Sequence, residues 1–329
     1  APMSANATEE NLNEISNYSD IEIIELSESY KNDDSIINPL LAGGEGLVED
    51  HSHDGSFSET TTASFGANFY IGATDTDDGS STANDLDDSI SAGYDFGISL
   101  NTSFTGEDSL DITIDAGNAS TFGEFDADAT AGDMLRVDGV TYTFPVGGAT
   151  VFVGDNTDGS LLFTTACVYG GPSNTLDDCG NVNAAITSGE TAFGASYDFE
   201  NGFTASVGVQ TGNELLTDQT QDALSLNAAY TGENYGVSVT YVSAENAALT
   251  DDDKATAFQG YYILDGSLPS ISVGYEVGDQ GGLASNVDGF ESFFVGLTWD
   301  EVGPGSAGIA AGHSNTVEGS DEAYMYEAY

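Results

Sequence analysis

The chain has 329 residues, and 56 acidic residues against 3 basic ones give it a formal net charge of −53. Nucleic-acid binding is excluded, because Lys31, Arg136 and Lys254 cannot neutralise a run of phosphates. Intrinsic disorder of the whole chain is excluded as well, because it carries 17 Phe and 16 Tyr, and disordered acidic chains are poor in aromatic residues.

The N-terminal part differs from the rest of the chain. Residues 1–7 contain Ala5-Asn6-Ala7, a small-x-small pattern that precedes signal-peptidase cleavage sites, so we interpret them as a signal-peptide remnant. The alternative is an ordinary flexible N-terminus. Residues 8–57 combine a short apolar stretch, Ile21–Leu26, with the turn-prone run Gly43–Gly46. They are predicted to form an N-terminal extension that lies in the periplasm or plugs a pore.

From about residue 60 onward, apolar residues alternate with small or polar ones. A strand places such residues on one face, whereas a helix would spread them around its circumference. The alternation therefore predicts strands. It is clearest at residues 63–71, 90–100, 110–114, 140–144, 235–241, 271–277 and 293–299.

Short turns and long acidic loops separate these stretches. Short turns are predicted at residues 147–148, 200–202, 232–234, 265–266 and 303–305, and long loops at 74–88, 118–137, 155–186, 244–254 and 278–289. Short turns at one end and long loops at the other are typical of membrane barrels. Residues 58–329 are therefore predicted to form an all-β, antiparallel up-and-down transmembrane β-barrel of about 14–16 strands.

A soluble β-sandwich would show the same alternation, with its apolar face turned inward. The barrel is favoured because a soluble sheet this large usually splits or curls. Aromatic residues near strand ends also favour it, and Tyr235, Tyr241 and Trp299 are predicted to lie at the lipid interface. The chain has no run of 18 apolar residues, which argues against a transmembrane helix.

Two cysteines, Cys167 and Cys179, lie in one predicted loop. An even number of cysteines in an exported chain predicts a disulfide, which would staple this loop. The alternatives are two free thiols or half of a metal site.

Four segments resemble the short porin-like outer-membrane proteins of marine picocyanobacteria: residues 40–73, 99–118 (with LNTSFTGED), 137–155 (with TYTFPVGGA) and 298–312. The loop bounded by the cysteines is similar to that family's too. The resemblance implies an exported β-barrel porin of the outer membrane. Larger relatives carry a module that binds the cell wall, and this sequence does not show it.

The resembling family continues past DEAYMYEAY, where this sequence stops at Tyr329. A terminal aromatic residue is common in barrels, so there are two alternatives: Tyr329 is the natural end, or the barrel lacks its last strand or strands. A sheet with open edges can add strands from other chains.

No catalytic constellation is present, so the chain is predicted not to be an enzyme. His51, His53 and His313 lack the HExxH spacing of zinc hydrolases, and neither a G-x-S-x-G elbow nor a phosphate-binding loop occurs. Two acidic runs could bind Ca²⁺, although solvated charge is the simpler interpretation. They are Asp75, Asp77 and Asp78, and Asp251, Asp252 and Asp253.

Four carboxylates fall on the polar face of predicted strands: Asp95, Asp111, Asp115 and Glu276. Rings of Asp or Glu favour cations in a pore, so we predict that these residues line one. The alternative is that they are scattered residues far from any constriction.

The sequence thus predicts an outer-membrane porin, a passive diffusion channel for small hydrophilic solutes or ions that prefers cations. Its expected partners are outer-membrane lipid and further copies of the chain, as a trimer or a polymer. One rival is an extracellular filament protein, assembled by strand addition and bridged by divalent cations. A second rival is a soluble acidic β-sandwich that binds glycans.

Overall fold

The computed structural model describes residues 61–73, 90–119, 122, 133–187, 190–212, 222–245, 252–279, 289–315 and 323–329. All of them belong to the unit formed by residues 51–329. The predicted signal-peptide remnant at 1–7 and almost all of the predicted N-terminal extension lie outside that unit, and neither lies among the described residues.

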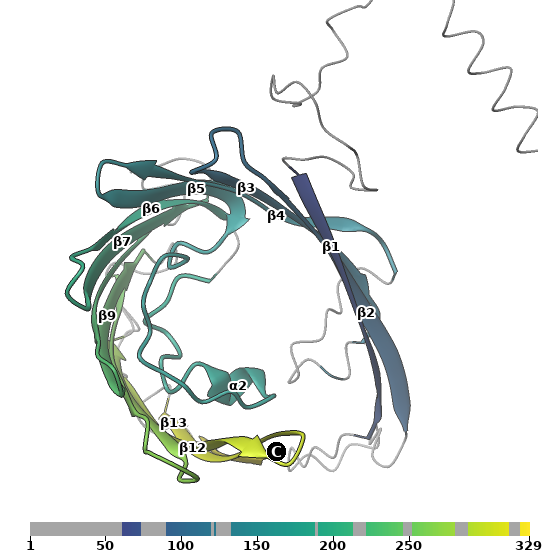
Figure 1. Cartoon of the computed structure of the whole chain (residues 1–329), viewed down its shortest axis with the longest axis vertical. Helices are drawn as coiled ribbons and strands as arrows, with labels where there is room; N and C mark the ends of the chain where they lie inside the picture. Colours follow the sequence, from purple (N-terminus) through teal and green to yellow (C-terminus); the bar gives the residue numbers. More distant parts are fainter. Residues whose placement is uncertain are drawn as a thin grey trace, which may run out of the picture. The chain divides into compact units, whose positions relative to one another are not determined.

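The described residues form one antiparallel sheet of 14 strands, in which each strand pairs with its neighbours in sequence (Figure 1). This confirms the predicted all-β, up-and-down architecture and its strand number. Strands β1 and β14 stand at the two ends of the order. The elements are β1 (Thr61–Gly72), β2 (Ser91–Thr102), β3 (Ser109–Gly117), β4 (Arg136–Val146), β5 (Ala149–Thr157), α2 (Asn174–Asp177), β6 (Glu190–Asp198), β7 (Phe203–Thr211), β8 (Asp222–Thr231), β9 (Tyr235–Ala244), β10 (Asp253–Tyr262), β11 (Ser270–Asp279), β12 (Phe290–Val302), β13 (Gly305–Asn315) and β14 (Ala323–Ala328).

Most apolar residues of the strands lie on one face and most polar residues on the other, as the alternation predicts. In β8, Leu226 is 47% exposed while its neighbour Ser225 is fully buried. Register keeps the two sets apart across strands, because Asn68 lies opposite Asp95 and Phe69 opposite Tyr94 in the β1–β2 pair. An apolar exterior and a polar interior invert the arrangement of a soluble sandwich.

The connections differ at the two ends of the strands. All five predicted short turns join consecutive strands, from β4–β5 to β12–β13, and Gly147 and Gly303 supply the positive φ that such turns need. A further short turn, residues 103–108 between β2 and β3, was not predicted. The longer connections alternate with these turns in sequence, so they join the opposite ends of the antiparallel strands.

The segment between β5 and β6 lies inside the curve of the sheet, with α2 in its middle (Figure 1). The sequence predicted only that residues 155–186 form one of the long loops. We call residues 158–187 the inner loop, and the sheet face that it contacts the inner face. No helix in the described part of the chain is long and apolar enough to cross a membrane.

Candidate functional site

The candidate site is the inner face together with the inner loop. The face is polar because every second residue of its strands is Ser, Thr, Asn, Gln, Asp, Glu or Gly over long stretches. Several of these side chains are buried and hydrogen-bond to the loop: Ser206, Asn227, Ser238, Gln259, Ser272, Glu276 and Ser292. They meet backbone groups of the loop, which has little regular structure to satisfy its own hydrogen bonds.

The first leg of the inner loop, which includes residues 162–168, crosses successive strands. Its backbone forms hydrogen bonds with side chains of β7, β8 and β9. Ser206 of β7 donates to the carbonyl of Leu162 at 3.0 Å. Asn227 of β8 accepts from the Thr164 N–H at 3.1 Å. Ser238 of β9 accepts from the Ala166 N–H at 2.9 Å. The leg is therefore fixed to the sheet by side chains that face inward.

A disulfide between Cys167 and Cys179 joins this leg to the returning one, with 6.2 Å between the two Cα atoms. The predicted disulfide is therefore present, and the structure contains neither of the alternatives. It lies beside an apolar cluster that includes Tyr169, Leu176 and Phe294.

The last strand also holds the inner loop. Glu327 of β14 accepts a hydrogen bond from the Tyr169 hydroxyl at 2.5 Å and another from the Ser173 N–H at 2.9 Å. Burial and the Glu327 carboxylate together raise the pKa of Tyr169, which therefore stays a neutral donor. These contacts link residues more than 150 positions apart in the sequence.

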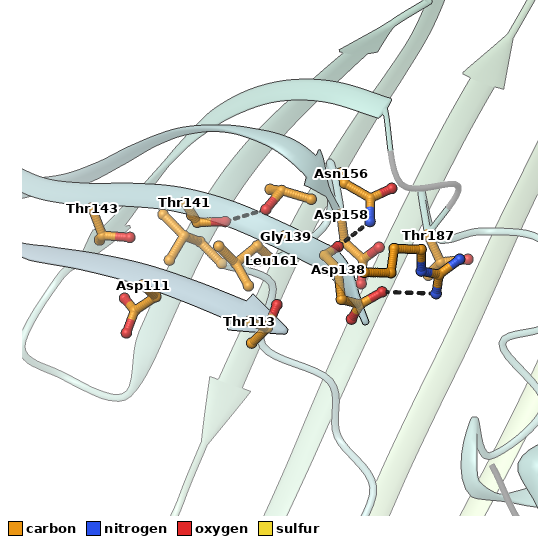
Figure 2. Close-up of a pocket in the computed structure, with 13 residues that line it drawn as sticks. Asp111, Thr113, Asp138, Gly139, Thr141, Thr143, Asn156, Asp158, Leu161 and Thr187 are labelled. Carbon is orange, nitrogen blue, oxygen red and sulfur yellow. Dashed lines mark hydrogen bonds and ion pairs between the residues drawn. The ribbon is translucent and has the colours of Figure 1, made fainter. Parts of the chain in front are cut away.

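A cavity of about 670 Å³ lies on the inner face beside β3, β4 and β5 (Figure 2). Asp111, Thr113 and Asp138 line it from β3 and β4, and Leu161 lines it from the inner loop. Register shifts in the β3–β4 and β5–β6 pairs fall beside it. Such bulges bend a strand and re-aim its side chains.

Arg136 lies at the edge of this cavity, between two carboxylates. Its Nη2 atom is 3.2 Å from Asp138 Oδ1 and 3.5 Å from Asp115 Oδ2, and its side chain is 43% exposed. Burial and the nearby Asp138 raise the pKa of Asp158, which lines the same cavity. Carboxylates thus outnumber the guanidinium around one polar space.

The four carboxylates predicted to line a pore all lie on the inner face, but they do not form one ring. Asp111 lines the cavity, and Asp115 pairs with Arg136. Asp95 accepts hydrogen bonds from Asn68 Nδ2 at 2.9 Å and the Tyr70 hydroxyl at 2.7 Å. Glu276 is 0% exposed, because the inner loop covers it.

The predicted calcium sites fall mostly outside the described residues, since only Asp252 and Asp253 are among those. Asp252 accepts a hydrogen bond from the Ser243 hydroxyl at 3.1 Å, and Asp253 begins β10. The described part of the chain contains no group of three His, Cys, Asp or Glu side chains that could hold a metal ion. His51 and His53 lie outside it, and the ring of His313 lies between those of Phe293 and Tyr324.

Tyr235, Tyr241 and Trp299 share the outer face with the apolar residues of their strands, opposite the inward Ser238 and Thr298. Tyr235 belongs to a row of three outward aromatic rings near the short turns: the Tyr230–Tyr235 ring centroids are 5.6 Å apart and the Phe203–Tyr230 centroids 4.7 Å. Sequence reasoning did not single out Phe203 or Tyr230.

Sequence reasoning also missed the inner loop. One signal could have indicated it: Phe290 and Phe294 occupy inward positions of β12, where a water-filled interior should have polar residues. Both are buried, Phe294 against Tyr169 of the loop and Phe290 in a cluster with Ala184. Inward aromatic residues therefore indicated that something covers this part of the sheet.

No protein-family model matches the chain, and no curated protein matches its sequence. Solved structures do match. A mutant of the Rh. blastica porin has a TM-score of 0.53 at 14% identity, over 81% of this chain and 89% of the porin. A porin refined at 1.8 Å has a TM-score of 0.52 at 13% identity, over 81% and 88%. At this identity the likeness concerns the fold, and the chain has the fold of a porin β-barrel.

Proposed function

We propose that the chain is an outer-membrane porin, a passive diffusion channel for small hydrophilic solutes or ions. The observation that carries this proposal is the inverted distribution of polarity in one 14-stranded sheet with the porin fold. An apolar outer face suits contact with lipid, and a polar inner face suits a water-filled passage. The tyrosines and Trp299 on the outer face would then lie at the lipid interface.

The passage would run along the part of the inner face that β1–β5 form. The inner loop covers much of the inner face from β7 to β14, as its hydrogen bonds to Ser206, Ser272 and Glu327 indicate. The cavity lined by Asp111 and Asp138 lies on the β3–β5 side. Solute would thus pass between the loop and this acidic surface.

We propose that the channel prefers cations. Asp95, Asp111, Asp115, Asp138 and Asp158 lie along the proposed path, against one arginine. Rings or clusters of carboxylates attract cations and repel anions at close quarters. Glu276 does not belong to this set, because the inner loop covers it completely.

The test is single-channel recording from purified protein in planar bilayers, with reversal potentials measured in a KCl gradient. We expect discrete conductance steps and a potential of the sign for cation preference. Arg136→Gln should increase the preference, because it removes the only guanidinium beside the path. Lys254→Gln removes an equal charge from the outward side of β10 and should leave the potential unchanged. Anion preference of the native chain would contradict the proposed selectivity, and absence of conductance would contradict the channel.

Other expectations remain predictions with their own measurements. Association into trimers or polymers is measured by light scattering in detergent. Ca²⁺ binding at the two acidic runs is measured by calorimetry. No catalytic activity is expected of a channel whose inner face serves only diffusion.

The filament protein remains a second candidate, because β1 and β14 each pair with one neighbour among the described strands. A free strand edge can pair with a strand from another chain. A filament protein would sediment without membrane, whereas a porin would extract into detergent and shift its electrophoretic mobility on heating.

A further inference from the structure

Strand β11 contacts both legs of the inner loop through three consecutive inward residues, Ser272, Gly274 and Glu276. Ser272 accepts a hydrogen bond from the Val168 N–H of the first leg at 3.0 Å. Gly274 lies against the Cys179–Gly180 backbone of the returning leg. Glu276 holds residues further along that leg. One strand therefore fixes the loop on either side of its disulfide.

Glu276 receives three hydrogen bonds from the returning leg. Its Oε2 atom accepts from the N–H groups of Asn183 at 2.8 Å and Ala184 at 3.0 Å, and its Oε1 atom accepts from Asn183 Nδ2 at 2.7 Å. The side chain is 0% exposed. A buried carboxylate needs such donors, because an unsatisfied one would be costly, and hydrogen bonds to a charged acceptor are stronger than neutral ones.

Gly274 allows the loop backbone to approach the sheet. A Cβ atom added at this residue would lie 1.8 Å from the carbonyl oxygen of Cys179, and 2.9 Å from its carbonyl carbon. Both are backbone atoms, so no side-chain rotation can relieve the overlap. Any larger residue at this position must move the loop away from β11.

We infer that Ser272, Gly274 and Glu276 position the inner loop, and thereby set the width of the channel proposed above. Glu276 is a positioning residue, although it resembles the pore carboxylates in sequence. The inference about width rests on the proposed function. The inference about loop position does not, and the two are measured separately.

The first measurement is hydrogen exchange of the full chain in detergent, which reports loop position without any current. Glu276→Ala should speed exchange at the Asn183 and Ala184 amides about tenfold or more, because both lose a charged acceptor. Glu276→Gln should show exchange rates between those of the native chain and those of Glu276→Ala, since its amide oxygen still accepts hydrogen bonds. Glu291→Ala is the matched control, because Glu291 lies on the outer face of the adjacent strand β12.

The second measurement is single-channel conductance of Gly274→Ala. The displaced loop should narrow the passage and lower the conductance. Gly260→Ala is the matched control: it lies on the outer face of the adjacent strand β10, away from the passage, and the nearest atom to an added Cβ is 3.4 Å away. If the heat-shift assay shows that Gly274→Ala does not fold, Ser272→Ala replaces it as a smaller change. Ser272→Ala should speed hydrogen exchange at the Val168 amide, which loses its acceptor.

Unchanged exchange in Glu276→Ala, or native conductance in a folded Gly274→Ala, would overturn the inference. If the native chain conducts nothing while Glu276→Ala still accelerates exchange, the channel proposal fails and the assignment of loop position stands.

Discussion

Asp108 shows how one carboxylate can organise a turn. It follows the short segment 103–107 and is buried, and its Oδ1 atom accepts from Ser103 Oγ at 2.8 Å and from the N–H groups of Phe104 at 3.0 Å and Thr105 at 2.7 Å. The Thr105 hydroxyl donates to the same oxygen, and the Tyr142 hydroxyl donates to Oδ2 at 2.6 Å. Asp108 thus ties the β2–β3 turn to β4.

These hydrogen bonds, that from Tyr142 above all, hold the pKa of Asp108 well below its usual range, although burial opposes them. A depressed pKa in the folded state stabilises the fold above the unfolded-state pKa of about 4, and this contribution is lost as the pH falls further. Asp108→Asn should therefore lower the thermal midpoint at pH 7, and the difference from the native chain should shrink below about pH 4.

Thermal unfolding in detergent at several pH values checks this prediction. Glu107→Gln is the control. The Glu107 side chain is exposed, so this substitution should leave the thermal midpoint unchanged. A constant difference between native chain and Asp108→Asn across the pH range would contradict the assigned role of the ionised carboxylate.

At the scale of elements, the strands were predictable and the inner loop was not. Strands repeat a local signal, the alternation of apolar and polar residues, which is visible in β2 or β9 without knowledge of any partner. The inner loop is held by contacts such as that between Thr164 and Asn227, 63 residues apart. No local pattern near Thr164 carries that information.

The candidate site was predictable to a similar extent. The inward location of Asp95, Asp111, Asp115 and Glu276 follows from strand period alone. Their different surroundings do not: Glu276 is covered by the loop, whereas Asp111 lines an open cavity. Sequence period reports which face a residue occupies, and the path of a distant segment decides whether that face is accessible.

The returning leg of the loop contains Asp178. Burial raises the pKa of its carboxyl group to about 6, and the charges of Asp177 and Glu276 raise it to a smaller extent. A raised carboxyl pKa means that the folded state binds more protons than the unfolded state between about pH 4 and that value. Its ionisation therefore lowers stability as the pH rises through this window, and the loss stays constant above it.

Asp178→Asn should consequently raise the thermal midpoint relative to the native chain at pH 8 and leave it unchanged below about pH 4. Unfolding curves at pH 4, 6 and 8 measure this difference. Asp265→Asn, in the exposed β10–β11 turn, is a suitable comparison. A destabilised Asp178→Asn at pH 8 would show that the charge contributes favourably to loop packing.

At the scale of the whole molecule, charge dominates. A net charge of −53 on 329 residues repels itself, and it disfavours the compact state most when few ions screen it. The Debye length falls from about 30 Å at 0.01 M salt to about 8 Å at 0.15 M, so most long-range repulsion disappears over that range.

The thermal midpoint in non-ionic detergent should therefore rise with NaCl between about 0.01 and 0.15 M. MgCl₂ at equal ionic strength separates general screening from site binding. Equal midpoints in the two salts would indicate screening alone, and a higher midpoint in MgCl₂ would support bridging by divalent ions. A midpoint independent of salt would contradict the electrostatic argument.

The hydrogen bonds from Tyr169 and Ser173 to Glu327 also bear on the order of folding. They close a span of more than 150 residues, and contacts of such sequence separation form slowly, because the entropy of the intervening chain must be lost first. The inner loop precedes in sequence every strand from β6 to β14 on which it rests. During synthesis, the loop can therefore take its final position only after these strands have formed. If the chain is the proposed channel, a barrel still under assembly would conduct more than a finished one.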